Sequence, residues 1–423
     1  MLEISKIREN SKEVVQRLKI KNFEAADLIN KLLDTDVKRR ETQKQLDDVL
    51  AESNAISKEI GELFKTGQAD KAGALKDKTA QLKVLAKDLA TKLDELSADQ
   101  NKTLVLLPNL PNASVPTGKS SEENAIVYSE GEVVNLDEKA LPHWEIAAKY
   151  NIIDFELGTK ITGAGFPLYK GKGAKLQRAL ISFFLEEAIA AGYTEYQPPL
   201  MVNEASAFAT GQLPDKDGQM YHVQIDNFYL IPTAEVPVTN IFRDMILNEN
   251  EMPLKCAAYS QCFRREAGSY GKDVRGLNRL HQFDKVEIVQ ITTPENSYNA
   301  LEEMSKYVQS LLRKLELPFR VAKLCGGDIS FASAMTYDME VWSAAQKRWL
   351  EVSSVSNFEA FQANRMKLRY RNAEGKMQLA HTLNGSALAL PRIVAALLEN
   401  NQTDKGIKIP KALVKYTGFE YVD

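Results

Sequence analysis

The sequence predicts an α+β protein in which a long helical hairpin precedes a larger domain built on a mostly antiparallel sheet. Three observations carry this prediction. Residues 25–99 contain no proline and repeat their apolar residues in heptads. The segment LLPNLPNASVP then ends the helical pattern with three prolines. Beyond it, several strand-length apolar segments follow one another, bounded by helical patterns rather than alternating with them one for one, which disfavours a doubly wound parallel fold.

Bulk composition excludes several classes of protein. With 423 residues, 44% hydrophobic and 26% charged, the chain has the length for two or three domains and the composition of a soluble globular protein. A net charge of -3 disfavours non-specific binding to nucleic acid or to membranes. The N-terminus MLEISKIREN has no apolar signal region, and no apolar run approaches the roughly 18 residues of a membrane span. We therefore expect a cytoplasmic protein without a membrane segment.

Cysteine and histidine are sparse and scattered. The three cysteines, Cys256, Cys262 and Cys325, form no CxxC pair and are too few for a disulfide framework. The four histidines fall in no HExxH spacing. We expect reduced, buried thiols and no zinc site.

The chain begins with a helical lead over residues 4–17 and continues into the hairpin. Leu46, Val49, Ile56, Ile60 and Leu63 follow a heptad if Ser53 fills one seam position, and a second register runs from Leu75 to Leu96 with Thr79 filling in. The break between them, KTGQADKAG, predicts the turn. Each helix would reach about 50 to 60 Å at 1.5 Å per residue. Lysines and arginines line the outer faces among acids, which fits an ordinary solvated face or a dimerising coiled coil.

The prolines after this hairpin place a domain boundary near residue 108. We predict a domain at 1–107 with the arm and a second domain at 108–423. Residues 115–165 are expected to be irregular. The glycine-rich GAGFPLYKGKGAK that follows contains neither GxxxxGK[ST] nor a complete GxGxxG, so any nucleotide is bound without the two common loop fingerprints.

The second domain shows a succession of helical and strand patterns. Leu176, Leu180, Phe184 and Ala188 recur at spacing four and predict a helix over 174–191. Thr293 as N-cap and Pro294 at the first helical position predict another, ending near residue 317. The remaining expected elements are a strand before QPP, a strand–turn–helix in FYLIPTAEVPVTNIF, strands at 319–324, 336–342, 349–355 and 377–383, and a last helix over 386–400.

One stretch, residues 262–287, organises the second domain. It is CFRREAGSYGKDVRGLNRLHQFDKVE, with arginines, acids and glycines between two apolar runs. We interpret it as a strand, a basic loop over about 268–279 and a returning strand that together hold a nucleotide, with the loop as a mobile lid. A solvated hairpin tip is the alternative, because glycines and charges also mark exposed turns.

Five motifs in order resemble one family. They are QPP at 197–199, TAE at 233–235, FRREAGSYGKDVRGLNRLHQF at 263–283, EVSS at 351–354 and TLNGSALALPR at 382–392. Together they resemble the class II aminoacyl-tRNA synthetases and, within them, the bacterial-type seryl-tRNA synthetases, and the resemblance covers the whole chain. Ala387 and Pro391 stand where that family often has glycine.

The resemblance implies a site for ATP. Arg264 would contact the α-phosphate and the amino-acid carboxylate, and Arg392 the γ-phosphate; these two are the expected catalytic residues. Glu266, expected on the strand two residues from Arg264, would meet the adenine edge while Phe283 stacks on the base. Phe283 as a core aromatic is the alternative. Further expected ATP contacts are Arg265, Glu351, Val352, Ser353 and Ser354, of which Glu351 and Ser354 would bind Mg²⁺. Lys272, Arg275 and Arg279 are candidates for phosphate or tRNA contacts.

The resemblance also implies a serine site. Glu235 would accept the α-ammonium group, and Glu287 and Ser386 would bond the side-chain hydroxyl. Thr233, Ala234, Arg264 and Asn384 complete the expected set.

The implied activity is that of a serine–tRNA ligase. Serine and ATP would give seryl-adenylate, and the seryl group would then pass to the 3′ end of tRNA(Ser), with tRNA(Sec) open as a second acceptor. The arm would bind the tRNA, and the chain would form a homodimer through the 174–191 helix and Pro198-Pro199. Two rivals stay open: a ligase that loads an amino acid onto a carrier protein, and a non-catalytic paralogue that binds RNA or a partner through the coiled coil.

Overall fold

The computed structural model describes residues 1–136, 140–267 and 275–423. They form two compact units, and each is described by itself. The first comprises residues 2–19 and 23–108; the second comprises residue 1, residues 20–22 and residues 109–423.

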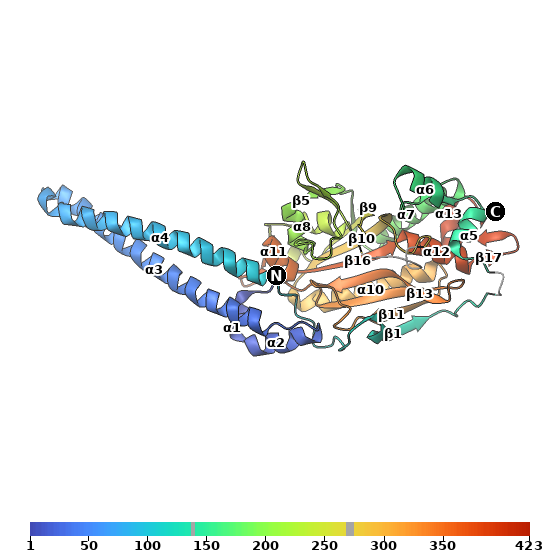
Figure 1. Ribbon diagram of the computed structural model, residues 1–423, viewed down its shortest axis with the longest axis horizontal. Helices are drawn as coiled ribbons and strands as arrows, with labels where there is room; N and C mark the ends of the chain where they lie inside the picture. Colours follow the sequence, from blue (N-terminus) through green and yellow to red (C-terminus); the bar gives the residue numbers. More distant parts are fainter. Residues whose placement is uncertain (137–139, 268–274) are drawn as a thin grey trace. The chain divides into compact units, whose positions relative to one another are not determined.

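Helices alone build the first unit within its described residues. They are α1 (Ile4–Glu9), α2 (Ser11–Ile20), α3 (Ala26–Lys65), a short 3₁₀ turn η1 (Ala69–Lys71) and α4 (Ala72–Leu104). Figure 1 shows α3 and α4 running side by side as one antiparallel arm. The long hairpin is confirmed, whereas the single lead helix over residues 4–17 is wrong because the chain breaks its helical path at Asn10.

The seam of the arm follows the predicted heptads. Leu46, Ile56, Leu82 and Leu89 are buried between the helices. The polar residue Thr79 is buried with them, and its hydroxyl donates to the Leu75 carbonyl of its own helix at 2.8 Å. A hydroxyl satisfied in this way occupies an apolar seam at little cost, which is why the register continues across it.

A buried aspartate ties the base of the arm together. Asp36 of α3 accepts hydrogen bonds from Arg8 at 2.8 Å, Arg40 at 3.0 Å and Gln100 of α4 at 3.1 Å. Burial by itself raises the pKa of this carboxyl, but these hydrogen bonds bring the pKa below its usual value. The network fixes α1, α3 and α4 to one another at the end of the arm that lies away from the turn.

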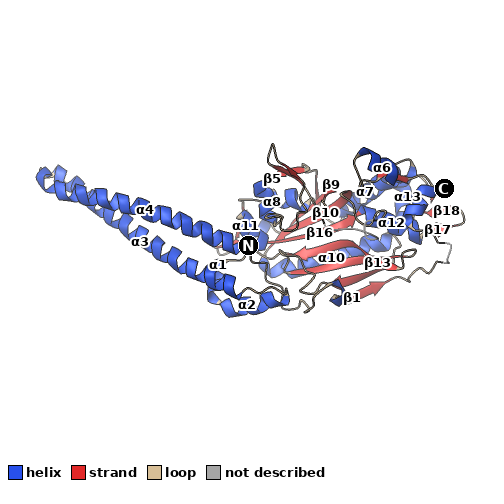
Figure 2. Ribbon diagram, viewed as in Figure 1, coloured by secondary structure: helices blue, strands red, loops and turns tan. Residues whose placement is uncertain are grey.

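The second unit is organised on a sheet of eight strands within the described residues. In order across the sheet they are β1 (Ala125–Glu130), β11 (Phe319–Lys323), β12 (Met335–Ser343), β13 (Arg348–Asn357), β16 (His381–Ala389), β10 (Gln282–Thr292), β9 (Leu254–Phe263) and β4 (Thr194–Tyr196). All neighbours are antiparallel except β4 and β9. The predicted α+β class with a mostly antiparallel sheet is confirmed (Figure 2).

Helices α7 (Lys172–Ala190), α10 (Ser297–Lys314) and α12 (Leu390–Asn400) pack on one face of this sheet. The spacing-four residues of α7, from Leu176 to Ala188, join the apolar core together with Val286 and Ile288 of β10. Val355 of β13 joins the same core. Burying this continuous apolar face supplies most of the unit's stability.

The opposite face of the sheet is covered at one end. Helices α8 (Glu204–Thr210), α9 (Glu235–Asn240) and α11 (Phe361–Met366) pack there around a second apolar cluster that includes Val289 and Ile291 of β10. Nearer the middle of the sheet the same face carries polar side chains, so a polar site lies beside the apolar cluster that these three helices cover.

Beyond the lead helix, three predicted elements of the second unit differ from the structure. Residues 115–165 are not irregular throughout, because β1, α5 (His143–Lys149), β2 (Ile153–Asp154) and α6 (Phe155–Ile161) lie there. The expected strand at 377–383 is divided between β15 (Met377–Leu379) and β16, which belong to different sheets. The last predicted helix begins at Leu390 rather than at residue 386, because Ser386 still belongs to β16 and Pro391 sits in the first turn of the helix.

The remaining strands form small sheets, and one further short α-helix is present. They are β2 with β3 (Leu168–Tyr169); β5 (Met201–Asn203), β7 (Phe228–Leu230) and β6 (His222–Val223); β15, β14 (Arg369–Arg371) and β8 (Ile246–Asn248); β17 (Gln402–Thr403), β18 (Gly406–Lys408) and β19 (Tyr421–Val422); and α13 (Lys411–Thr417). No helix of the described residues has the length and apolar content needed to cross a membrane.

Candidate functional site

The polar face of the large sheet collects most of the sequence-predicted residues. In the ladder of β10 and β16, Glu287 lies opposite Ser386, and Val289 lies opposite Asn384. Side chains at alternate positions share a face, so Phe283 and Glu287 of β10 point the same way. The structure thereby brings Glu287, Ser386 and Asn384 together, although the sequence placed Ser386 on a helix.

One carboxylate of this face is already neutralised. Lys285 donates from its ammonium group to Glu287 at 2.5 Å and to the Thr233 hydroxyl at 2.9 Å. The Thr233 hydroxyl in turn donates to the Glu287 carboxylate at 3.2 Å. All three side chains are buried. A buried carboxylate that has a lysine and a hydroxyl as partners keeps one face for a neutral hydrogen-bonding group.

A second buried carboxylate lacks such a cation. Glu235, in the first turn of α9, accepts a hydrogen bond from Gln362 at 2.7 Å. Among the described residues, no lysine or arginine forms an ion pair with it. Burial, and then the nearby negative charge of Glu287, raise the pKa of Glu235 to about 7. The site therefore offers an uncompensated carboxylate next to a compensated one, an arrangement suited to a ligand with its own positive charge.

Gln362 is held rigidly in that position. The Thr382 hydroxyl donates to its amide oxygen at 2.6 Å, and its amide nitrogen also donates to the Thr210 carbonyl at 3.1 Å. The amide orientation is thus fixed by a donor on one side and by two acceptors on the other. Gln362 orients the Glu235 carboxylate.

Arg264 lies just outside the strand on which the sequence placed it. Strand β9 ends at Phe263, and the Arg264 amide donates to the His281 carbonyl at 3.0 Å. Its guanidinium group donates from Nε to the Pro232 carbonyl at 3.3 Å and lies over the Phe283 ring, 5.2 Å from its centroid. The cation therefore stands between the segment that carries Thr233 and the aromatic ring expected to stack on a base.

Glu266 also leaves the predicted strand. Its backbone has φ 49°, outside the extended region, and its carboxylate pairs with Arg279 at 3.0 Å. The expected strand alternation with Arg264 is wrong for this reason. Arg265 donates from its amide to the Gln219 carbonyl at 2.9 Å, and its side chain is exposed. Lys272 and residues 268–274 of the loop predicted over about 268–279 lie outside the described residues.

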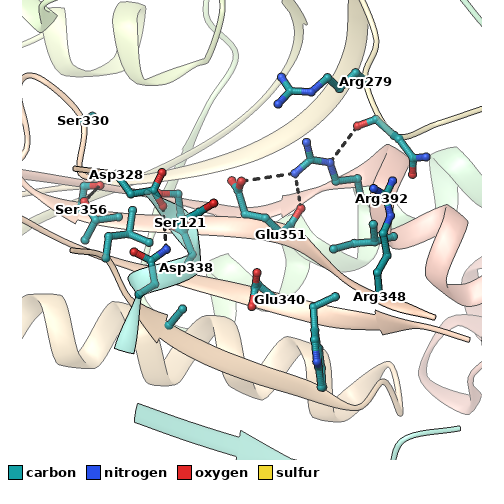
Figure 3. Close-up of a pocket in the computed structure, with 18 residues that line it drawn as sticks. Ser121, Arg279, Asp328, Ser330, Asp338, Glu340, Arg348, Glu351, Ser356 and Arg392 are labelled. Carbon is teal, nitrogen blue, oxygen red and sulfur yellow. Dashed lines mark hydrogen bonds and ion pairs between the residues drawn. The ribbon is translucent and has the colours of Figure 1, made fainter. Parts of the chain in front are cut away.

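The other end of the site is a cavity of about 560 Å³ over β12 and β13 (Figure 3). Arg392, near the start of α12, points into it and donates to the Glu351 carbonyl at 2.7 Å and to the Asn278 carbonyl at 3.1 Å. Its guanidinium also pairs with the Glu351 carboxylate at 3.5 Å. Arg279 and Arg348 also line this cavity and add two further cations to it.

A β-bulge places the predicted metal ligands on one face. Glu351 and Ser354 are three residues apart, so a regular strand would turn them to opposite faces. The ladder between β12 and β13 shifts here, with Asp338 opposite Ser354 but Glu340 opposite Glu351. Val352 is the extra residue of this bulge. Both predicted ligands therefore line the cavity.

The other two residues of this motif are placed differently. The side chain of Val352 is buried in the apolar core, and Ser353 is buried with its hydroxyl donating to the Ser386 carbonyl at 2.5 Å. The structure therefore does not bring these two side chains to the cavity. Ala234 is fully buried beneath the site.

Sequence reasoning missed several residues of the site, including Lys285, Gln362 and Arg348. Lys285 alternates with Phe283 and Glu287 on one strand, and this alternation is a signal that could have identified it. Gln362 lies in α11, about 130 residues from Glu235 along the chain, and no local pattern indicates the contact. Among the described residues, no group of three or more histidine, cysteine, aspartate or glutamate side chains has the arrangement of a metal site, and the three cysteines are free and buried.

Two family models match the chain. The model described as "tRNA synthetase class II core domain (G, H, P, S and T)" matches residues 221–401. The model described as "Seryl-tRNA synthetase N-terminal domain" matches residues 1–111.

Full-length relatives agree with these models. The serine–tRNA ligase of Salinibacter ruber is 51% identical over 421 residues, covering 99% of this chain and 98% of the relative. That of Chlorobaculum parvum is 46% identical over 433 residues, covering 100% of both. The solved structure of seryl-tRNA synthetase from Pyrococcus horikoshii complexed with ATP superposes with a TM-score of 0.92 at 33% identity, covering 99% of each chain. The chain therefore belongs to the seryl-tRNA synthetase family of class II, ATP-dependent aminoacyl-tRNA ligases.

Proposed function

We propose that this chain activates L-serine with ATP to give seryl-adenylate and pyrophosphate, and then transfers the seryl group to the 3′ end of tRNA(Ser). The observation that carries the proposal is the pair of buried carboxylates, Glu287 neutralised by Lys285 and Glu235 without an ion-pair partner among the described residues. Serine has both features that this pair requires, an ammonium group and a hydroxyl.

Serine is held by groups at the β10 and β16 end of the site. Its ammonium group binds Glu235, because Glu287 already has its cation. Its hydroxyl bonds Glu287 and Ser386, which lie opposite each other in the ladder. Thr233, Ala234 and Asn384 shape the remaining wall. Alanine is disfavoured because it would leave unmade the hydrogen bond that the serine hydroxyl adds to the partners Glu287 already has, and a missing hydrogen bond at a buried polar group costs about 1–3 kcal/mol.

ATP lies between the two ends of the site. Arg264 contacts both the α-phosphate and the serine carboxylate, which must approach each other for in-line attack. Phe283 stacks on the adenine while Glu266 and Arg265 approach the nucleotide from the chain beyond β9. Arg392 binds the γ-phosphate. No protein nucleophile is required, so catalysis rests on positioning and on stabilising the charge that develops on the phosphate.

The residues at the cavity fit a magnesium ion. The Glu351 carboxylate and the Ser354 hydroxyl are hard oxygen donors, and the bulge at Val352 turns both to the same face. We propose that these two residues hold Mg²⁺ together with phosphate oxygens of ATP. When bound, the ion neutralises phosphate charge and orients the leaving pyrophosphate. The Arg392 pair with Glu351 keeps the carboxylate directed toward this place.

The two domains divide the work. We propose that domain 1–107 binds tRNA(Ser) through the α3–α4 arm by backbone and shape contacts, and that domain 108–423 carries the chemistry and the contacts of a homodimer. Charging of tRNA(Sec) is open to the same chemistry, because it would accept the same seryl group. The chain works in the cytoplasm and uses no zinc.

Exchange of labelled pyrophosphate into ATP tests the activation step. Serine is expected to support this exchange without tRNA, because adenylate formation is reversible on the enzyme. If none of the amino acids supports exchange, the proposal is contradicted.

The activity is expected to depend on the ionisation of Glu235. The pKa of this carboxyl is raised to about 7, and only its ionised form binds an ammonium group. Below pH 7, kcat/KM for serine should therefore fall about tenfold per pH unit, and above pH 7 it should level off. In Glu235→Gln, kcat/KM for serine should be low at every pH and should show no inflection near pH 7. A profile for the parent chain that stays flat from pH 5.5 to 8.5 would refute the assignment of Glu235 to the ammonium group.

A further inference from the structure

A fully buried histidine and glutamate lie behind the phosphate end of the site. His143 is the first residue of α5, and Glu399 lies near the end of α12. The His143 ring nitrogen Nδ1 is 2.7 Å from Glu399 Oε1, and the His143 backbone amide donates to the same oxygen at 3.0 Å. Neither residue contributes to the site as described above, and His143 lies outside residues 221–401, the range of the class II core model.

The second ring nitrogen of His143 holds a distant part of the chain. The Leu277 backbone amide donates to His143 Nε2 at 2.8 Å. A ring nitrogen that accepts an amide hydrogen carries no proton, so the ring is the neutral tautomer whose Nδ1 hydrogen is donated to Glu399. Although burial raises the pKa of Glu399, the hydrogen bonds from His143 and Ser343 bring that pKa below its usual value. Glu399 and the Leu277 amide therefore each fix one ring nitrogen of His143.

Leu277 belongs to the returning end of the connection between β9 and β10. The chain approaches α5 so closely there that a Cβ on Gly276 would lie 2.2 Å from His143 Nε2, and Gly276 has φ 65°. One residue earlier, the Arg275 guanidinium lies over the Trp144 ring, 4.6 Å from its centroid. Glycine is thus required at 276 both for its backbone and for this close contact.

A further hydrogen bond connects this part of the chain to Arg392, the arginine proposed to bind ATP. The carbonyl of Asn278, the residue after Leu277, accepts from Arg392 Nε at 3.1 Å. The Asn278 side chain donates to Gln346 at 3.1 Å, and Gln346 donates back to Glu399 at 3.1 Å. His143, Leu277, Asn278, Gln346 and Glu399 therefore form a closed ring of contacts, and the Asn278 carbonyl accepts from Arg392 outside this ring.

We propose that His143 is a positioning residue for the nucleotide: through the Leu277 amide it fixes Asn278, whose carbonyl directs the Arg392 guanidinium at the phosphates. The inference rests on the proposed function, because it takes Arg392 as a phosphate ligand. A purely structural histidine would be satisfied by its bonds to Glu399, and its contact with Leu277 would have no bearing on ATP.

Two substitutions of His143 separate its two contacts. The side-chain amide of glutamine reaches the place of Nε2 and can accept from Leu277. That of asparagine reaches only the place of Nδ1 and can donate to Glu399 but not hold Leu277. His143→Asn should raise the Kd for ATP and the KM for ATP about tenfold, the loss of one hydrogen bond to a buried amide. His143→Gln should stay within about threefold of the parent chain. The KM for serine should change less than about twofold in both.

Ser343→Ala is the matched control, because it removes a hydrogen bond to Glu399 without touching the loop. It should lower the thermal unfolding temperature and leave the Kd for ATP unchanged. The positioning role is overturned if His143→Asn binds ATP as the parent does, or if His143→Gln is the more impaired variant. If His143→Asn does not fold, Gly276→Ala tests the same contact from the loop side, and unchanged ATP binding by that variant overturns the role.

Calorimetric ATP binding without amino acid keeps this inference separate from the proposed function. A parent chain that binds ATP but shows no exchange with serine contradicts the proposed function and leaves the His143 comparison intact. If the parent chain exchanges with serine but His143→Asn leaves the Kd for ATP unchanged, the inference about His143 is contradicted and the proposed function is not.

Discussion

Arg264→Ala is expected to slow serine-dependent pyrophosphate exchange by about 10²–10³-fold, corresponding to about 3–4 kcal/mol of transition-state stabilisation. The guanidinium group lies over Phe283 and bonds the Pro232 carbonyl, so it stands between the proposed places of adenine and serine. Both the attacking carboxylate and the α-phosphate are anionic, and without this cation they repel each other as they approach. The loss should appear mainly in kcat, measured by exchange at saturating serine and ATP.

Two further variants sharpen this prediction. Arg264→Lys should recover only part of the rate, because an ammonium group keeps the charge but cannot contact two anions as a planar fork does. Arg369→Ala, an exposed arginine of β14, is the control and should exchange at the parent rate. An Arg264→Ala variant that exchanges within a fewfold of the parent would remove Arg264 from the chemistry.

Deletion of the arm should separate activation from transfer. Removing residues 44–91 with a short glycine–serine linker keeps Asp36 with its partners Arg8 and Gln100, which hold the base of the hairpin together. Exchange should stay near the parent rate, because no proposed ATP or serine residue lies in the arm. Charging of tRNA(Ser) with labelled serine should fall by about 10²-fold or more. Several contacts between the arm and the tRNA backbone, at about 1 kcal/mol or more each, are lost together.

The comparison of the two assays decides the role of the arm. A charge-reversed but full-length arm, with Lys44, Lys58, Lys83 and Lys87 changed to glutamate, is the companion variant because it leaves the buried seam in place. It should retain exchange and lose charging like the deletion. Equal loss of exchange and charging in the deletion would mean that the arm is structural.

The helical parts of the protein follow from local signals. The arm could be predicted because a heptad requires only neighbours along the chain, and the seam tolerates Thr79 through a hydrogen bond within its own helix. Helix α7 could likewise be predicted from a local pattern, its apolar residues at spacing four. The antiparallel class of the sheet follows from the succession of strand patterns, which does not require knowing which strands are neighbours.

The precise geometry of the site depends on contacts that local patterns do not contain. Glu351 and Ser354 share a face only because Val352 bulges, and strict alternation would have separated them. Ser386 extends a strand where apolar residues also suit a helix, because β10 and β13 both pair with β16. The Gln362 contact with Glu235 depends on packing between distant helices. Strand alternation failed for Glu266 because the backbone turns beyond Phe263.

Pyrophosphate exchange measured with each of the twenty amino acids tests the central claim most directly. Serine should support exchange, and alanine and threonine should each be disfavoured by about 10- to 10²-fold in kcat/KM, alanine because Glu287 loses its hydroxyl partner and threonine because of its extra methyl group. Preference for serine would support a site in which Glu235 binds the ammonium group and Glu287 binds the hydroxyl. Exchange with another amino acid in preference to serine, or with none, would contradict the account.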